Sequence, residues 1–294
     1  MTAVETFEAH RHMMLALAYR MLGDLERAED VVQDAWMRWA GRAEEVDAPK
    51  AFLLKVVTRL CLNEMGSARA RREESRSDRL PEPIDLGDGA IGRMEMVDQI
   101  SMAFLVVLQR LTPAERATLL LHDVFDLEHA EIGALLGKSE VACRQLLSRS
   151  RAHIAEEKRA MTTSRDEHRR LLQAFVDASS SGDQRRLIEI LADDATLVVD
   201  AGPSGKRVGR IRNLGRPLVG ARRIAAFLGA LARGTELPGS YQERELNGQT
   251  AMLRIVAGRA QSALFISVAN GKIRRVFVQA DEARLSRVGL GPSA

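Results

Sequence analysis

The chain has 294 residues, enough for two domains or for three small ones. Hydrophobic residues make up 46% and charged residues 28%, an ordinary composition that excludes a chain disordered throughout. The two cysteines, Cys61 and Cys143, stand in helical apolar patterns, which excludes a disulfide scaffold and a cysteine zinc site. The longest apolar stretch, near 102–108, is too short to cross a bilayer, and the N-terminus lacks the pattern of a signal peptide. We therefore expect a cytoplasmic protein with no membrane contact.

The charge is distributed unevenly along the chain. The formal net charge is +3, but residues 1–200 carry a net −8 and residues 201–294 a net +11. A protein that simply coats DNA would be basic throughout. Any contact with nucleic acid in the first 160 residues must therefore come from local basic patches.

Residues 5 to about 72 are predicted to be helical. Apolar residues recur at helical spacing from Phe7 to Leu22, and Gly23 and Asp24 break the pattern. A second helix is expected over 26–40, and Pro49 begins a third one as an N1 residue. The third helix leads into a basic run made of Arg69, Arg71, Arg72, Arg76 and Arg79.

Residues 79–93 hold two prolines, three glycines and three acidic residues, a composition that predicts a linker. Helices resume near Met94. Thr112-Pro113-Ala114-Glu115 is a capping box with proline at N1, a strong helix start. A short helix near 128–136, a turn at 137–139 and a longer helix from Glu140 to about Glu156 give the helix-turn-helix pattern.

The last third of the chain is predicted to be an α+β domain. Helices are expected over 166–179, 183–192 and 221–232, with Asp193-Asp194 as a helix-end turn before a strand at 196–200. Four further strands are expected at 241–246, 250–257, 261–269 and 272–279. The pairs Asn247-Gly248 and Asn270-Gly271 favour tight hairpin turns between them.

Two motifs, Ala28-Glu29-Asp30-x-x-Gln33-Asp34-x-Trp36 and Val56-Val-Thr-Arg-Leu-Cys61-Leu-Asn63, precede the basic run, the acidic linker and the helix-turn-helix. This order resembles the sigma factors of bacterial RNA polymerase, specifically the short extracytoplasmic-function type of the sigma-70 family. The resemblance implies a multidomain protein with two all-α domains followed by an α+β SnoaL-like cone. The expected boundaries are a region 2 helical bundle at 1–78, a linker at 79–93, a region 4 helix-turn-helix domain at 94–160 and the cone at 165–290.

The resemblance also implies binding to core RNA polymerase through the second helix. Carboxylates and an amide on one helix face can pair with an arginine-rich coiled coil. Charge complementarity would speed the association and fix the register of the two partners. Taken alone, these residues could equally form a solvated helix face. The expected polymerase-binding residues are Glu29, Asp30, Gln33, Asp34 and Trp36.

Promoter DNA is the second partner implied. Phe52 is the only aromatic residue between 50 and 80, so opening of the −10 element should rely on extruded bases and on arginines that hold the backbone. Asn63 could read a base edge there, and Arg69, Arg71 and Arg72 could contact phosphates; the alternative is a solvated helix end. In the helix-turn-helix, Ser139 caps the second helix, and the side chains expected to read the −35 element share one face: Arg144, Gln145, Ser148 and Arg149.

The C-terminal third resembles the SnoaL-like, ketosteroid-isomerase-type cone that one branch of these sigma factors carries. The linker sequence Leu80-Pro81-Glu82-Pro83 is a hallmark of that branch. We expect a regulatory intramolecular contact between this linker and the cone, through Asp200 and the basic residues Lys206 and Arg207. Opposite charges on two tethered halves favour such docking.

No histidine follows His168, and Tyr241 is the only tyrosine of the cone, so we expect no catalysis, no cofactor and no metal. Whether the cone binds a small ligand stays open. Two alternatives compete with the sigma factor. One is a helix-turn-helix regulator with a ligand-sensing cone, and the other is a cone enzyme fused to a DNA-binding module.

Overall fold

The computed structural model describes residues 2–67, 79–85, 101–160, 163–202, 214, 216–234 and 239–289. They form two compact units. The first contains two helical domains, here called helical domain I (residues 2–67) and helical domain II (residues 104–156). The second contains the linker segment 79–85, residues 101–103 and the cone from residue 163 onward. Within these described ranges, no helix has both the length and the apolar character needed to cross a membrane.

Helical domain I consists of α1 (Ala3–Leu22), α2 (Leu25–Ala40), a short 3-10 helix (Ala43–Glu45) and α3 (Pro49–Met65). The helix α1 begins before the predicted Phe7, because Thr2 and Glu5 form a capping box. It ends at Gly23, whose φ of 68° is the left-handed conformation that glycine adopts without strain. Asp24 then caps α2, and Pro49 occupies the first position of α3 as predicted.

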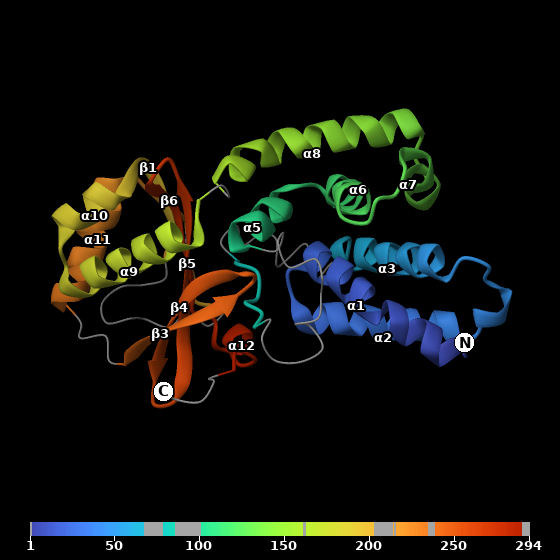
Figure 1. The fold of residues 1–294 in the computed structure, drawn as a ribbon, viewed down its shortest axis with the longest axis horizontal. Coiled ribbons are helices and arrows are strands. Elements are labelled where there is room, and N and C mark those ends of the chain that lie inside the picture. The colour runs from blue at the N-terminus through green and yellow to red at the C-terminus, as the bar shows by residue number, and fades with distance from the viewer. Residues whose placement is uncertain are drawn as a thin grey trace. The chain divides into compact units, whose positions relative to one another are not determined.

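The three helices of helical domain I pack on one another (Figure 1). The indole nitrogen of the buried Trp39 donates to the carbonyl of Ala3 at 2.7 Å, which ties the end of α2 to the start of α1. An ion pair of 2.8 Å between Arg27 and Glu64 joins α2 to α3. The outer faces of α2 and α3 are therefore held in a fixed relation to each other.

Helical domain II consists of α5 (Met102–Arg110), α6 (Pro113–Asp123), α7 (His129–Leu136) and α8 (Glu140–Ala160). The Thr112–Glu115 capping box is confirmed at the start of α6. The helix α7 ends at Gly137 with a φ of 66°, and Ser139 caps α8 by accepting a hydrogen bond from the Ala142 amide at 3.2 Å. The helix-turn-helix is thus formed, and α8 continues beyond the predicted end near residue 156.

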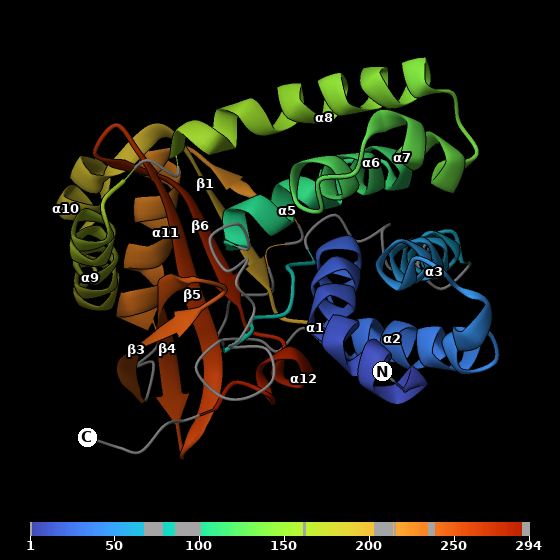
Figure 2. The same ribbon diagram turned by 45° about the vertical axis from the view of Figure 1, so that its right-hand side comes forward.

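The cone contains a six-stranded sheet in the order β2-β1-β6-β5-β4-β3, in which only β1 and β6 run parallel. Helices α9, α10 and α11 cover one face of this sheet (Figure 2). The strands are β1 (Leu191–Asp200), β2 (Leu218–Val219), β3 (Ser240–Leu246), β4 (Gln249–Val256), β5 (Arg259–Ala269) and β6 (Lys272–Gln279). The helices are α9 (Arg165–Ser181), α10 (Gln184–Ile190), α11 (Ala221–Gly234) and α12 (Glu282–Leu285).

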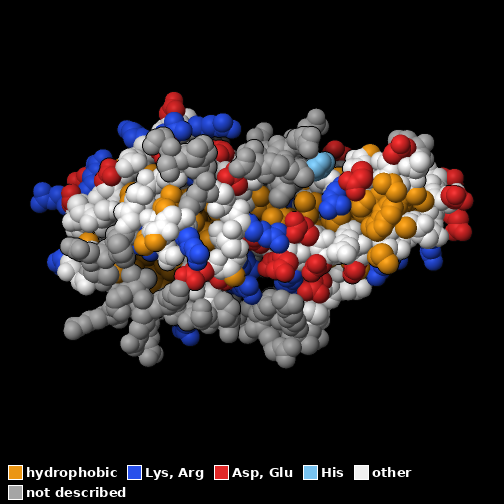
Figure 3. Space-filling view, turned by 90° about the horizontal axis from the view of Figure 1, so that it is seen from below, with side chains coloured by type: hydrophobic (Ala, Val, Ile, Leu, Met, Phe, Trp, Pro, Cys, Tyr) orange, Lys and Arg blue, Asp and Glu red, His pale blue; other side chains and the backbone are white. Residues whose placement is uncertain are grey.

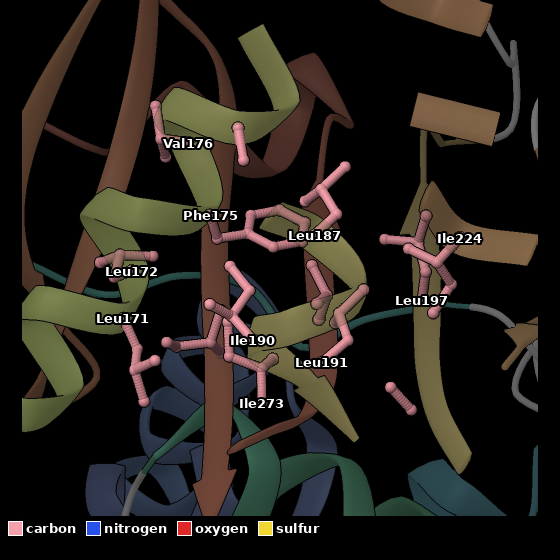
Figure 4. Packing of buried hydrophobic residues seen from close by; sticks show 14 of the residues in the cluster. Leu171, Leu172, Phe175, Val176, Leu187, Ile190, Leu191, Leu197, Ile224 and Ile273 are labelled. Carbon is pink, nitrogen blue, oxygen red and sulfur yellow. The ribbon is translucent and has the colours of Figure 1, made fainter. Parts of the chain in front are cut away.

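The main core of the cone lies between its helices and the sheet (Figure 4). Phe175 of α9, Leu187 of α10 and Ile224 of α11 are buried against strand residues such as Ile273. Alternate residues of a strand point to opposite faces of a sheet. Val276 therefore joins this core, whereas its neighbour Phe277 is buried on the opposite face.

The two predicted hairpin turns are confirmed. Asn247 and Gly248 have φ values of 52° and 65°, and Asn270 and Gly271 have values of 54° and 69°. A third tight turn of the same kind, at Ala257-Gly258, has φ values of 50° and 72°. Alanine rarely adopts this conformation, so this turn could not be predicted from its local residues.

One expectation for the cone is wrong, and two short elements were not predicted. Asp193 and Asp194 do not form a helix-end turn, because α10 ends at Ile190 and both residues lie in β1. The pairing of β1 with β6 shifts between Leu191 and Thr196, so this part of the strand is irregular. The short elements β2 and α12 were not predicted, because neither is long enough to give a periodic pattern.

We predict that Leu187→Ala lowers the stability of the cone by about 2–5 kcal/mol, because it opens a cavity in the core. The neighbouring Ile188 is 37% exposed, so Ile188→Ala is a matched control with a much smaller effect. Hydrogen–deuterium exchange of the amides in β5 and β6 measures the difference. Equal protection in the two variants would contradict the assignment of this core.

Candidate functional site

The outer face of α2 is acidic. Its side chains Glu29, Asp30, Gln33 and Asp34 are all exposed, while residues between them face the core of helical domain I. Trp36, also predicted to bind polymerase, is half-buried, and its ring packs edge-to-face on Phe7 with centroids 5.0 Å apart. The structure therefore brings the predicted set onto one helix, with the tryptophan at the border of the core.

Two exposed apolar side chains of helical domain I were not predicted from the sequence. Met37 of α2 is 72% exposed and Val4 of α1 is 55% exposed. Figure 3 displays a hydrophobic patch at this end of α1 and α2 with acidic side chains beside it. Met37 follows Gln33 by four residues and Asp30 by seven, so helical spacing alone would have placed it on the acidic face. Exposed apolar patches with a polar border are typical of protein-binding sites.

The outer face of α3 is polar and basic. Asn63 is exposed, as expected for a residue that reads a base. Lys55 and Arg59 precede it at intervals of four residues and are also exposed, so all three lie along one side of the helix. Lys55 and Arg59 were not predicted, although their four-residue spacing from Asn63 is present in the sequence. The predicted phosphate contacts Arg69, Arg71 and Arg72 lie outside the described residues.

The helix α8 separates buried from exposed side chains cleanly. Residues Cys143, Leu146, Leu147 and Ser150 are buried, whereas the predicted readers Arg144, Gln145, Ser148 and Arg149 are all exposed. Arg144 forms an ion pair of 2.6 Å with Glu140, one turn earlier on the same helix. Arg149 lies 3.9 Å from Glu115 of α6. Glu140 therefore competes with any other partner for this guanidinium group.

Both cysteines belong to the core. Cys61 and Cys143 are free thiols with side chains that are shielded from solvent. Burial raises the pKa of each thiol above its ordinary value, so the reactive thiolate is disfavoured. Neither residue has the environment of a redox sensor.

A polar cluster holds α8 against the end of α6. Burial would raise the pKa of Asp123, but hydrogen bonds from Arg151 and His122 outweigh it, and the pKa lies below its usual value. Arg151 donates its Nε to Asp123 at 3.2 Å, and the ring of His122 stacks on His129 of α7 at 4.7 Å. These contacts connect α6, α7 and α8.

The linker segment 79–85 is hydrogen-bonded to the cone. The amide of Leu80 donates to the carboxylate of Asp200 at 2.8 Å. The side-chain amide of Gln279 donates to the carbonyls of Leu80 at 3.2 Å and of Pro81 at 3.4 Å. Arg284 of α12 also donates to the Leu80 carbonyl. Leu80 and Asp200 were both predicted for this contact, whereas Gln279 and Arg284 were not.

The other end of this segment is bound at the hairpin between β3 and β4. The Ile84 amide donates to the side-chain oxygen of Asn247 at 3.1 Å, and the Asn247 amide donates to the Ile84 carbonyl at 2.9 Å. Asp85 forms an isolated antiparallel bridge with Leu246. The basic residues Lys206 and Arg207, predicted to make this contact, lie outside the described residues.

A close approach at Gly202 completes the site around Asp200. The Gly202 amide donates to the Asp200 carboxylate at 2.9 Å, and Gly202 has a φ of 74°. A Cβ atom at this position would come within 2.6 Å of the carboxyl carbon of Asp281. Any side chain here would therefore displace Asp281, whose amide donates to the Gln279 side-chain oxygen at 3.0 Å.

The cone offers few groups for proton transfer. His168 of α9 lies against the sheet, where its Nε2 is 3.2 Å from the Ile266 carbonyl oxygen. Burial lowers its pKa, which favours the neutral ring. In the described parts of the chain, no group of three histidine, cysteine or acidic residues is arranged to hold a metal ion.

Comparison with known proteins adds to this picture. Residues 6–72 match the family described as sigma-70 region 2, and residues 101–154 match sigma-70, region 4. The chain is similar to the probable ECF RNA polymerase sigma factor SigI of Mycobacterium tuberculosis, with 32% identity over 280 residues, which cover 92% of this chain and 91% of that protein. It is similar to the ECF RNA polymerase sigma factor SigJ of the same organism, with 34% identity over 283 residues, which cover 92% and 89%.

The fold is similar as well. The crystal structure of the M. tuberculosis extracytoplasmic function sigma factor SigJ superimposes with a TM-score of 0.73 at 28% identity, and covers 97% of this chain and 98% of that one. The similarity therefore extends through both helical domains and the cone.

We predict that Asp123→Asn destabilises helical domain II by about 1 kcal/mol near neutral pH, a modest value because Arg151 is half exposed to water. The lowered pKa means that the ionised carboxylate stabilises the fold above its ordinary pKa of 3.8, and that this contribution disappears as the pH falls through the folded-state pKa. Urea unfolding followed by circular dichroism should separate the two proteins near pH 7 and not near pH 2. Asp126→Asn, an exposed neighbour, is the control. An equal loss at both pH values would contradict this role of the carboxylate.

Proposed function

The chain belongs to the extracytoplasmic-function sigma factors of the sigma-70 family, and we propose which of its surfaces carry out each step of that function. As a sigma factor it binds RNA polymerase and promoter DNA and directs transcription initiation; its C-terminal domain is a SnoaL-like cone. The site of its action is the cytoplasm, where polymerase and chromosome are found.

Docking on core polymerase occurs through the outer face of α2. Asp30, Gln33 and Asp34 supply charge and hydrogen-bonding groups for a basic partner surface, and Met37 supplies an apolar anchor among them. Long-range charge attraction accelerates the encounter, while a desolvated apolar side chain at the centre of an interface contributes affinity. This mixed acidic and apolar face is the observation that carries the proposal, because a helix-turn-helix alone fits many DNA-binding proteins.

Two helices contact promoter DNA. Along α3, Lys55 and Arg59 contact the phosphate backbone and Asn63 contacts a base of the opened −10 element, together with Arg69, Arg71 and Arg72 of the following basic run. Along α8, Arg144 and Gln145 read base edges of the −35 element in the major groove, beside Ser148 and Arg149. Ser139 fixes where α8 begins.

The cone regulates initiation by holding the linker. Its contacts with Leu80 and Ile84 restrict the chain that connects the two DNA-binding domains, and this restriction limits how the domains engage a promoter. We propose no catalytic activity for it. His168 is the one histidine of the described cone, and its Nε2 already faces a backbone carbonyl oxygen.

The two alternatives are less well supported. A helix-turn-helix repressor binds duplex DNA by itself, usually as a symmetric dimer on a palindrome, and has no use for the acidic face of α2. A cone enzyme would need an acid–base pair with access to substrate, and the Nε2 of His168 already faces the Ile266 carbonyl oxygen.

We predict that the double variant Asp30→Lys with Gln33→Lys abolishes binding to core polymerase and leaves helical domain I folded. Both side chains are exposed, so the loss comes from charge reversal at the interface rather than from unfolding. Pull-down of core enzyme and run-off transcription measure the effect. Glu44→Lys with Glu45→Gln, which adds the same charge of +3 outside α2, is the control. Retention of core binding by the first variant would refute the assignment of α2.

We predict that Asn247→Gly weakens the attachment of Ile84 to the cone and changes the transcription rate, whereas Asn270→Gly does neither. Both asparagines begin Asn-Gly turns with φ near 50°, and glycine adopts that conformation freely, so the two turns should persist. Only Asn247 is bonded to Ile84, and Asn270 is exposed. Amide exchange at residues 80–84 and run-off transcription are the readouts. Faster linker exchange without any change in transcription would exclude regulation through this contact.

A further inference from the structure

An exposed valine lies at the start of α8. The side chain of Val141 is 59% accessible to solvent. A β-branched residue is a weak helix former, and an exposed one gains no burial in return. Folding of helical domain II therefore gives no reason for valine at this position.

Val141 shares its helix face with the residues proposed to read DNA. Arg144, Gln145 and Ser148 follow it by three, four and seven residues, the spacing of one helical stripe, and all of them are exposed. Cys143 and Leu147 lie on the buried side of the helix. A duplex that contacts Arg144 and Gln145 must therefore also meet Val141.

The position of Val141 is fixed by the turn that precedes it. Ser139 caps the helix through the Ala142 amide. The backbone of Lys138 packs so closely on α7 that a Cβ atom at Gly133 would lie 2.7 Å from the Lys138 carbonyl oxygen. Residues in the first turns of a recognition helix are the ones that contact base edges in the major groove.

The major groove offers one apolar group that matches an aliphatic side chain, the C5-methyl group of thymine. We propose that Val141 packs against the methyl group of a thymine in the −35 element and selects a T·A pair at that position. This proposal rests on the assignment of α8 as the reader of that element. The partner is DNA rather than protein, because Arg144 and Gln145 on the same stripe carry the groups that pair with base edges in the major groove.

The size of the effect can be estimated. Burial of one methyl group is equivalent to about a four-fold change in affinity. Removal of the thymine methyl should therefore weaken binding about four-fold at a single position of the element. A serine in place of Val141 should abolish that dependence, whereas an isoleucine should keep it.

The experiment uses holoenzyme assembled from the full chain and core polymerase. A promoter is first selected from a library with a randomised −35 element, and each of its thymines is then replaced singly by deoxyuridine, which lacks only the methyl group. Binding is measured for the wild type and for Val141→Ser, Val141→Ile and the control Val219→Ser, whose valine is 47% exposed on β2 of the cone. We expect one thymine whose methyl matters to the wild type, Val141→Ile and Val219→Ser but not to Val141→Ser.

Two outcomes overturn the proposal. In one, no thymine of the selected element depends on its methyl group. In the other, the dependence is the same in Val141→Ser. A parallel measurement with Arg144→Ala distinguishes failure of the role proposed for Val141 from failure of the assignment of α8 as the reader of the −35 element. If Arg144→Ala leaves the selected −35 sequence unchanged, α8 is not the reader and the basis of the proposal is lost. If it changes that sequence while the methyl test fails, only the role of Val141 is rejected.

Discussion

The structure of the linker depends on polar groups supplied from the far end of the sequence. Residues 80–84 are buried in an extended conformation, where backbone amides and carbonyls cannot bond to each other as they do in a helix. Pro81 and Pro83 lack an N–H, so they remove two donors that would otherwise need partners. Asp200, Asn247 and Gln279 provide partners for the amides of Leu80 and Ile84 and for the carbonyls of Leu80, Pro81 and Ile84. A buried polar group without a partner costs about 1–3 kcal/mol, so this segment requires the folded cone.

This dependence gives the cone a role that needs no chemistry of its own. One face of its sheet is covered by α9, α10 and α11 and forms the main core, and the linker is bound by Asp200 and Gln279 at the ends of β1 and β6. Asp200 and Gln279 lie side by side because they are partners in the register of these parallel strands. Different residues therefore stabilise the core of the cone and bind the linker. A substitution of the linker-binding residues can alter the linker without unfolding the domain.

Local signals in the sequence predicted most of the elements, because they act over a few residues. The capping box at Thr112, the proline at the start of α3 and the asparagine–glycine turns are each determined by backbone chemistry within four residues. The partners of Leu80 could be predicted only in part, since Asp200 and Gln279 lie more than one hundred residues away and only pairing of β1 with β6 brings them together. Asp193 was misassigned for a related reason. Its polar neighbours suggest a turn, and the sheet contacts that extend β1 through it are not encoded locally.

The two surfaces proposed to bind partners both combine charged side chains with one exposed apolar side chain. The apolar side chains were not predicted from the sequence. On α2 the exposed Met37 accompanies Asp30 and Gln33, and on α8 the exposed Val141 accompanies Arg144. Charged side chains attract partners over distances of about 8 Å in physiological salt, but they discriminate poorly among partners of the same sign. An apolar side chain contributes only on contact and only where the opposing surface matches it. Charge therefore governs how fast each surface finds its partner, and the apolar residue adds the selectivity that charge alone does not supply.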